Sequence, residues 1–159
     1  GSVPHIADTY YFVGWFTDEA CTDSVPDNWV DDSGKITPMA VDGIIKEATY
    51  YAKVEPRKLT ITKKGDVQDN ETFLFNVKNI EKNIDMVVAV TGKGSATIEY
   101  IPSGDYTVTE LDDWSWKYES TAAKNIQVLA TDSAVTVEFT NTRNDNKLLG
   151  DETNINNKF

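Results

Sequence analysis

The sequence predicts an all-β protein in which a β-sandwich or β-barrel follows a smaller β-rich unit. From Arg57 onward, short segments alternate between apolar and polar residues, as strands with one buried face do. Turn-forming residues separate these segments at intervals of roughly 8–12 residues, which is typical of sandwiches and barrels. This part of the sequence contains no amphipathic helical pattern of any length.

The first predicted unit spans residues 3–55 and is rich in aromatic residues. Two segments have strand composition, TYYFVGWFTDEAC at 9–21 and ATYYAKVE at 48–55. The segment between them is dense in Asp, Pro, Asn and Gly, and we expect loops and turns there. The aromatic side chains either form a carbohydrate-stacking surface or make the core of a unit that lacks aliphatic residues. We favour the core for these residues: Tyr10, Tyr11, Trp15, Trp29, Tyr50 and Tyr51.

The second predicted unit spans residues 57–143 and consists of short strands. We expect them at residues 58–64, 71–79, 85–92, 97–101, 105–111, 126–130 and 134–142. The segment GKGSA between the third and fourth strands has neither a Walker spacing nor a following helix, so we expect a hairpin turn. Residues 144–159 are rich in Asn and Asp, and we expect a linker or tail.

Composition excludes several classes of function. The chain has 159 residues and a net charge of −11, which argues against binding to nucleic acid. No apolar run is long enough to span a bilayer. Cys21 is the only cysteine and His5 the only histidine, so an internal disulfide and a cysteine metal site are excluded. We find no catalytic cluster, and we expect no enzyme, no cofactor, no metal and a monomeric chain.

Three predicted strands each end an apolar stripe with a polar residue. The inward set of the first strand is Leu59 and Ile61, and alternation places Lys63 next. The same count puts Glu110 after Tyr106 and Val108, and Asn141 after Val135, Val137 and Phe139. Alternation is therefore compatible with an amine, a carboxyl and a carboxamide on one core face. Alternatively, the strand ends reach solvent and the three residues are ordinary polar termini.

Burial of these three groups would give them a specific chemistry. Burial disfavours the charged forms of Lys63 and Glu110, and so favours the neutral amine and the neutral acid. A neutral amine is a nucleophile, and a protonated carboxyl polarises a carbonyl and shuttles protons. If the groups touch, we expect Lys63 to attack the side-chain carbonyl of Asn141 while Glu110 donates to the developing oxyanion. Ammonia leaves, and an amide crosslink remains.

The same segments carry a family resemblance. LTITKKG, SGDYTVTE and VEFTNTR resemble the first-strand lysine, the glutamate strand and the closing strand of collagen-adhesin B-type (Cna-B) domains. The resemblance implies a prealbumin-like or Ig-like β-sandwich in a Gram-positive surface protein. It also implies an intramolecular isopeptide bond between Lys63 and Asn141, assisted by Glu110. We further expect Trp114 and Trp116 to cover the core beside Glu110.

The first unit resembles the second half of internalin-type B repeats, which are small β-grasp-like units. The resemblance rests on Phe12, Gly14, Trp15 and Phe16, then Tyr50, Tyr51, Ala52 and Lys53, whereas the opening strands of that family do not precede them. We therefore expect either a truncated unit or one that is completed by its neighbour. Repeats of this kind are tandem spacers in bacterial surface proteins.

Two functions follow from these resemblances. The first is a stalk or spacer module of a secreted, cell-wall-anchored adhesin or pilin-like protein, whose partners are neighbouring domains of the same polypeptide. Gly1 and Ser2 resemble a protease-cleavage scar, so we expect the export signal and the anchor to lie outside this sequence. The second is an adhesin module that binds a glycan or a host matrix protein through the aromatic first unit.

Overall fold

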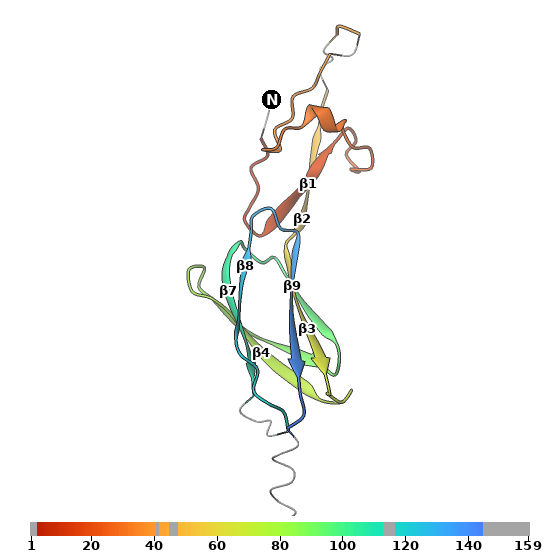
Figure 1. Cartoon of the computed structure of the whole chain (residues 1–159). Helices are drawn as coiled ribbons and strands as arrows, with labels where there is room; N and C mark the ends of the chain where they lie inside the picture. The colour runs from red at the N-terminus through yellow and green to blue at the C-terminus, as the bar shows by residue number, and fades with distance from the viewer. Residues whose placement is uncertain (1–2, 41, 45–47, 113–116, 145–159) are drawn as a thin grey trace, which may run out of the picture.

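The computed structural model describes residues 3–40, 42–44, 48–112 and 117–144 of this elongated all-β protein. A small amino-terminal unit and a β-sandwich lie end to end along the long axis (Figure 1). The expected cover of Trp114 and Trp116, and the tail from residue 145, fall outside the described residues. Within the described residues, no helix is long and apolar enough to cross a membrane.

The amino-terminal unit is built on an antiparallel strand pair. Strand β1 (Tyr10–Phe16) pairs with β2 (Tyr51–Pro56), and a bulge interrupts the register after Phe12. A single 3-10 turn, η1 (Asp27–Trp29), lies in the loop between the strands. The structure thus has strands in both segments where strand composition predicted them.

The second unit is a sandwich of two sheets and not a barrel. One sheet has the strand order β6-β3-β9 and the other the order β5-β4-β7-β8. The bounds of the strands are β3 (Lys58–Gly65), β4 (Thr72–Asn79), β5 (Ile84–Thr91), β6 (Ser95–Glu99), β7 (Gly104–Leu111), β8 (Lys124–Val128) and β9 (Ala134–Asn141). Each of these strands overlaps a predicted one, so the sandwich is confirmed.

The boundaries of β6 and β8 lie two residues earlier than predicted. Strand β6 ends at Glu99 because Tyr100 adopts a left-handed backbone conformation, with φ 61°. Strand β8 ends at Val128 because the next residues form a turn, in which the Leu129 amide donates to the Asp132 carboxylate at 2.7 Å. Tyr100 ends β6 two residues before the Pro102 signal from which that turn was predicted, and the turn after β8 contains neither Gly nor Pro.

The core lies between the two sheets and follows the alternation of the strands. Its buried side chains include Leu59, Ile61, Phe73, Phe75, Val77, Tyr106, Val108, Val137 and Phe139. The Phe75 and Phe139 rings meet across the sandwich with their centroids 5.0 Å apart. Apolar burial of this kind stabilises the fold by about 25 cal/mol for each Å² removed from water.

Strands β3 and β9 are neighbours and run parallel, both away from the amino-terminal unit (Figure 1). Their register extends from Lys58 opposite Ala134 to Gly65 opposite Asn141. Gly65 has φ +103°, and a Cβ atom there would lie 2.2 Å from the Asn141 carbonyl oxygen. Only glycine combines this backbone conformation with so close an approach.

Arg57 joins the amino-terminal unit to the sandwich. It is 1% exposed and immediately precedes β3. Its guanidinium donates to backbone carbonyl oxygens of both units, those of Asp8, Tyr10, Ile101, Ala130 and Asp132. Because Arg stays charged when buried, these carbonyls provide the compensation that its desolvation requires.

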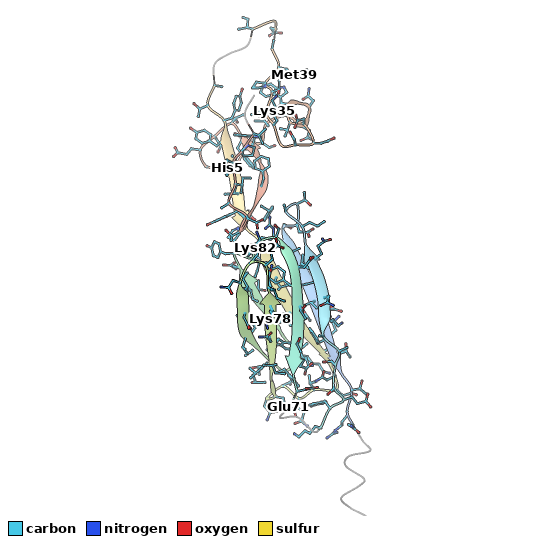
Figure 2. The ribbon with its side chains drawn as sticks, turned by 90° about the vertical axis from the view of Figure 1, so that its left-hand side faces the viewer. His5, Lys35, Met39, Glu71, Lys78 and Lys82 are labelled. Atoms are coloured by element: carbon cyan, nitrogen blue, oxygen red, sulfur yellow. The ribbon has the colours of Figure 1, made fainter. Side chains whose placement is uncertain are left out.

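Asp8 is the carboxylate of this joint. It forms an ion pair with Arg57 at 3.4 Å and another with Lys82 at 3.5 Å, and it accepts a hydrogen bond of 2.6 Å from the Ser103 hydroxyl. Lys82 lies at the end of the sandwich next to the amino-terminal unit (Figure 2). Burial opposes ionisation of Asp8, but the Ser103 hydrogen bonds and the charge of Lys82 outweigh it and lower the pKa of this carboxyl.

Replacing Arg57 tests the joint. Arg57→Met keeps the aliphatic stem but leaves several carbonyls without a donor, so we expect the free energy of unfolding to fall by about 3 kcal/mol. Urea denaturation measures it. The matched control is Lys58→Met, because the Lys58 side chain is 46% exposed and pairs only at the surface with Glu99. The control should change the free energy by less than about 0.5 kcal/mol, and an equal loss in both variants would contradict the role of Arg57.

Replacing Gly65 tests the close approach of β3 and β9. Gly65→Ala should lower the free energy of unfolding by about 2 kcal/mol or more, because the added methyl group strains the backbone and displaces Asn141. The control is Gly14→Ala in β1, where the added Cβ atom meets only the Phe16 ring at 3.8 Å. Thermal unfolding compares the two. A Gly65→Ala protein as stable as the control would show that the approach is not restrictive.

Candidate functional site

Lys63, Glu110 and Asn141 lie together in the core of the sandwich. Their exposed fractions are 1%, 4% and 3%. Lys63 and Asn141 come from neighbouring strands of one sheet, β3 and β9, whereas Glu110 comes from β7 in the other sheet. Each residue faces inward because it continues the alternation of its strand. The strand ends therefore do not present these groups to solvent.

Glu110 lies between the other two side chains and contacts both. The Lys63 Nζ donates to Glu110 Oε2 at 2.8 Å, and the Asn141 Nδ2 donates to Glu110 Oε1 at 2.7 Å. The Asn141 Oδ1 is buried and has no hydrogen-bond partner among the residues that the structure describes. In the unreacted arrangement the carboxylate thus accepts from the amide nitrogen of Asn141, and the expected donation from Glu110 to a developing oxyanion stays a prediction.

The surroundings of Lys63 disfavour its positive charge. Burial lowers the pKa of this amine, and the hydrogen bond and charge of Glu110 offset the effect only in part. The amine lies 4.5 Å from the centroid of the Phe73 ring and 5.7 Å from that of Phe75. These aromatic faces attract a cation but provide no hydrogen-bond acceptor comparable to water. The neutral amine is thus more accessible here than on a surface lysine.

Thr121 is a fourth member of the cluster that the sequence analysis did not single out. Its hydroxyl donates to Glu110 Oε2 at 2.9 Å, the oxygen that also accepts from Lys63. Thr121 lies in the connection between β7 and β8, outside every predicted strand. Alternation carries no information about a residue outside the strands, so no sequence signal pointed to Thr121.

Tyr118 covers this end of the sandwich. It is 6% exposed, and its ring lies 5.7 Å from that of Phe73, centroid to centroid. Its hydroxyl donates to Glu71, whose carboxylate also pairs with Lys117 at 3.2 Å. Burial and this hydrogen bond raise the pKa of Tyr118 to about 12, which keeps the phenol protonated as a donor. Glu71 marks the end of the sandwich opposite the amino-terminal unit (Figure 2).

The segment that carries Tyr118 is held by the residues after β9. Tyr118 and Arg143 form an antiparallel bridge. The Glu119 amide donates to the Thr142 carbonyl at 3.0 Å, and the Asn144 amide donates to the Lys117 carbonyl at 2.8 Å. Residues 117–119 and 142–144 therefore close the end of the core next to the cluster.

Other reactive side chains do not join this cluster. His5 is exposed and lies in the amino-terminal unit (Figure 2). The Cys21 thiol, in the same unit, donates to the Glu19 carbonyl at 3.8 Å. In the residues that the structure describes, no group of three or more His, Cys, Asp or Glu side chains could hold a metal ion. Among the described residues, the buried amine, acid and amide are thus the one cluster of side chains whose contacts point to a particular reaction.

Aromatic side chains of the amino-terminal unit pack against one another. Phe12 and Trp15 meet edge to face with centroids 5.9 Å apart, and Trp29 and Tyr50 do so at 6.1 Å. The Trp15 indole donates to the Gly34 carbonyl at 2.8 Å. Such contacts support a role of these rings in the core of the unit more than a stacking surface for sugars.

Solved structures of other proteins are similar to part of this chain. The Bacillus anthracis TIE protein is 23% identical, with a TM-score of 0.43 over 58% of this chain and 19% of its own. The Streptococcus agalactiae minor pilin GBS52 is 15% identical, with a TM-score of 0.43 over 60% of this chain and 53% of its own. A Mobiluncus mulieris adhesin that contains disulfide, isopeptide and ester crosslinks is 15% identical, with a TM-score of 0.40 over 70% and 53%.

The chain thus spans between 19% and 53% of the length of these solved structures. No curated protein sequence matches it. A family model described as a domain of unknown function, DUF5979, matches residues 57–144, from the buried arginine of the joint to the residues that close the core. The matched segment includes all four members of the buried cluster, and the chain belongs to the DUF5979 family.

Proposed function

We propose that this chain is a stalk or spacer module of a bacterial surface adhesin or pilin-like protein. Its sandwich is stabilised by an autocatalytic isopeptide bond between Lys63 and Asn141, assisted by Glu110. The observation that carries the proposal is the buried contact of these three side chains, with Glu110 hydrogen-bonded to both others. The resemblance of the same strands to Cna-B domains supports it. Its partners are neighbouring domains of the same polypeptide at the cell surface.

The two oxygens of Glu110 suit a proton shuttle. Oε2 takes a proton from the Lys63 ammonium, and the neutral amine attacks the Asn141 side-chain carbon. Oε1 then delivers a proton to Nδ2, the C–N bond of the amide breaks, and Nδ2 leaves as ammonia. The amine loses two protons in total, of which one leaves with ammonia and the other remains on the carboxyl. A new amide joins the two strands.

Exclusion of water favours this reaction over its alternatives. Since all three groups are buried in the core, water has little access to hydrolyse the tetrahedral intermediate. Because Glu110 is hydrogen-bonded to both reacting side chains, it also replaces a bimolecular encounter with an intramolecular one, which contributes several kcal/mol to the lowering of a barrier. No external substrate is consumed, so the module does not act as an enzyme.

The position of the bond suits a load-bearing module. Strands β3 and β9 are parallel neighbours, and the bond would join them at the ends farther from the amino-terminal unit. Tension along the long axis would pass through residues 58–63 and the crosslink into the residues after Asn141. Residues 64–140 would carry none of it.

Intact mass spectrometry tests the crosslink. The wild-type chain should weigh one ammonia less than its sequence, because the amide nitrogen of Asn141 is lost. Lys63→Ala, Asn141→Ala and Glu110→Ala should each restore the full mass. Lys64→Ala is the matched control, because Lys64 is the next residue but is exposed and pairs with Glu138 at the surface. The control should keep the mass deficit.

A wild-type chain at its full sequence mass would end the proposal. A deficit that persists in Lys63→Ala would also end it, because a different pair of residues would then be linked.

Single-molecule pulling tests the mechanical role. When the chain is held at its two ends, the wild-type sandwich should not release residues 64–140 at any force below covalent rupture. The Asn141→Ala protein should unfold and add the full contour length of the sandwich. Release of this segment in a chain shown by mass to be crosslinked would contradict the force path.

A further inference from the structure

We propose that Thr121 is a positioning residue for the crosslinking reaction, which holds the Glu110 carboxyl so that one oxygen faces Lys63 and the other faces Asn141. This inference rests on the proposed function and adds a residue to it. The segment that carries Thr121 takes its place only when the residues after Asn141 pair with it, so the positioning residue and the reacting amide arrive together.

The hydrogen bonds of Glu110 support the first part. Oε2 accepts from the Lys63 amine at 2.8 Å and from the Thr121 hydroxyl at 2.9 Å, whereas Oε1 accepts from the Asn141 amide at 2.7 Å. Lys63 and Asn141 are the reactants, and their bonds to Glu110 change as protons move. Among the donors to this carboxyl in the described residues, Thr121 alone keeps its chemical identity throughout.

Such an anchor matters because the last torsion of a glutamate is broad and roughly two-fold. A carboxyl that rotates about this torsion would lose one or both of its contacts with the nucleophile and the leaving group. Misplacement of a catalytic group by about 1 Å can slow a reaction by about a hundredfold. A fixed donor on Oε2 limits this rotation after Lys63 has given up its proton.

Backbone pairing brings Thr121 to the site. The Glu119 amide donates to the Thr142 carbonyl at 3.0 Å, and Tyr118 bridges Arg143. Thr121 follows Glu119 by two residues, and Asn141 directly precedes Thr142. One short ladder therefore fixes both Thr121 and the strand end that carries Asn141, which links the reaction to completion of the fold.

A pair of substitutions at Thr121 tests the positioning role. Thr121→Val keeps the shape of the side chain but removes the hydroxyl, whereas Thr121→Ser keeps the hydroxyl. Each full chain is made in a short cell-free pulse, and the mass deficit is followed over time. We expect Thr121→Val to crosslink about tenfold more slowly than wild type, and Thr121→Ser to stay within about twofold.

The serine variant separates positioning from packing. A Thr121→Val chain that crosslinks at the wild-type rate would overturn the proposal. Equal slowing of both variants would also overturn it, because loss of the methyl group would then matter as much as loss of the donor. If the wild-type chain never loses ammonia, the proposed function fails and this role fails with it. The role alone fails if wild type and Thr121→Val both crosslink at one rate.

A second pair of variants tests how Thr121 is brought to the site. Glu119→Pro removes the amide that donates to Thr142, and Glu119→Ala keeps it. We expect the proline variant to crosslink at least about fivefold more slowly than the alanine variant. Circular dichroism and the melting temperature confirm that both chains fold. Equal rates in two folded chains would overturn the coupling between the ladder and the reaction.

Discussion

A lysine and a glutamate are buried inside an otherwise apolar sandwich, and the structure of the end of the core that Tyr118 closes depends on how their charges are compensated. Removing two charges from water costs several kcal/mol per ion, and their attraction repays the cost only with good geometry and further hydrogen bonds. Here the Lys63 amine meets Glu110 directly, and Asn141 and Thr121 use the remaining capacity of the carboxylate. The core beside the cluster is closed by Tyr118 and the short ladder around it.

Arg57, which precedes β3, and Lys63, which lies in β3, are both buried basic residues, and their surroundings compensate for the loss of water in different ways. Arg57 stays charged and is surrounded by carbonyl oxygens from both units, which makes it a structural joint. Lys63 has one carboxylate and two aromatic faces around it, and its pKa is lowered. A lysine can lose its proton under such conditions, whereas an arginine cannot. The surroundings of Arg57 therefore suit a structural contact between the two units, whereas those of Lys63 suit a reaction of its amine.

Much of the sandwich could be predicted because its strands alternate strictly. The inward positions of Lys63, Glu110 and Asn141 followed from the same count that placed Leu59, Val108 and Phe139 in the core. Alternation gives the face of a residue but not the distance between residues on different strands, so the contacts among the three came only with the structure. The crosslink itself stays a proposal.

Residues outside the strands could not be found in this way. Thr121 and Tyr118 lie in a connection whose course depends on long-range pairing with residues 142–144. Arg57 marked only the start of the predicted second unit, and its role depends on carbonyl groups contributed by three separate parts of the chain, at residues 8–10, 101 and 130–132. Local sequence patterns describe side-chain periodicity, and they do not report which backbone carbonyls will converge on one guanidinium.

The parallel course of β3 and β9 has a geometric consequence for assembly. The chain enters the sandwich at the pole held by Arg57 and leaves it at the pole closed by Tyr118 (Figure 1). Modules of this design joined in series would stack lengthwise instead of doubling back, and each would add its own height to the whole. The length of such an assembly would then grow in proportion to the number of modules. The contacts of Arg57 in each module would limit bending between its amino-terminal unit and its sandwich.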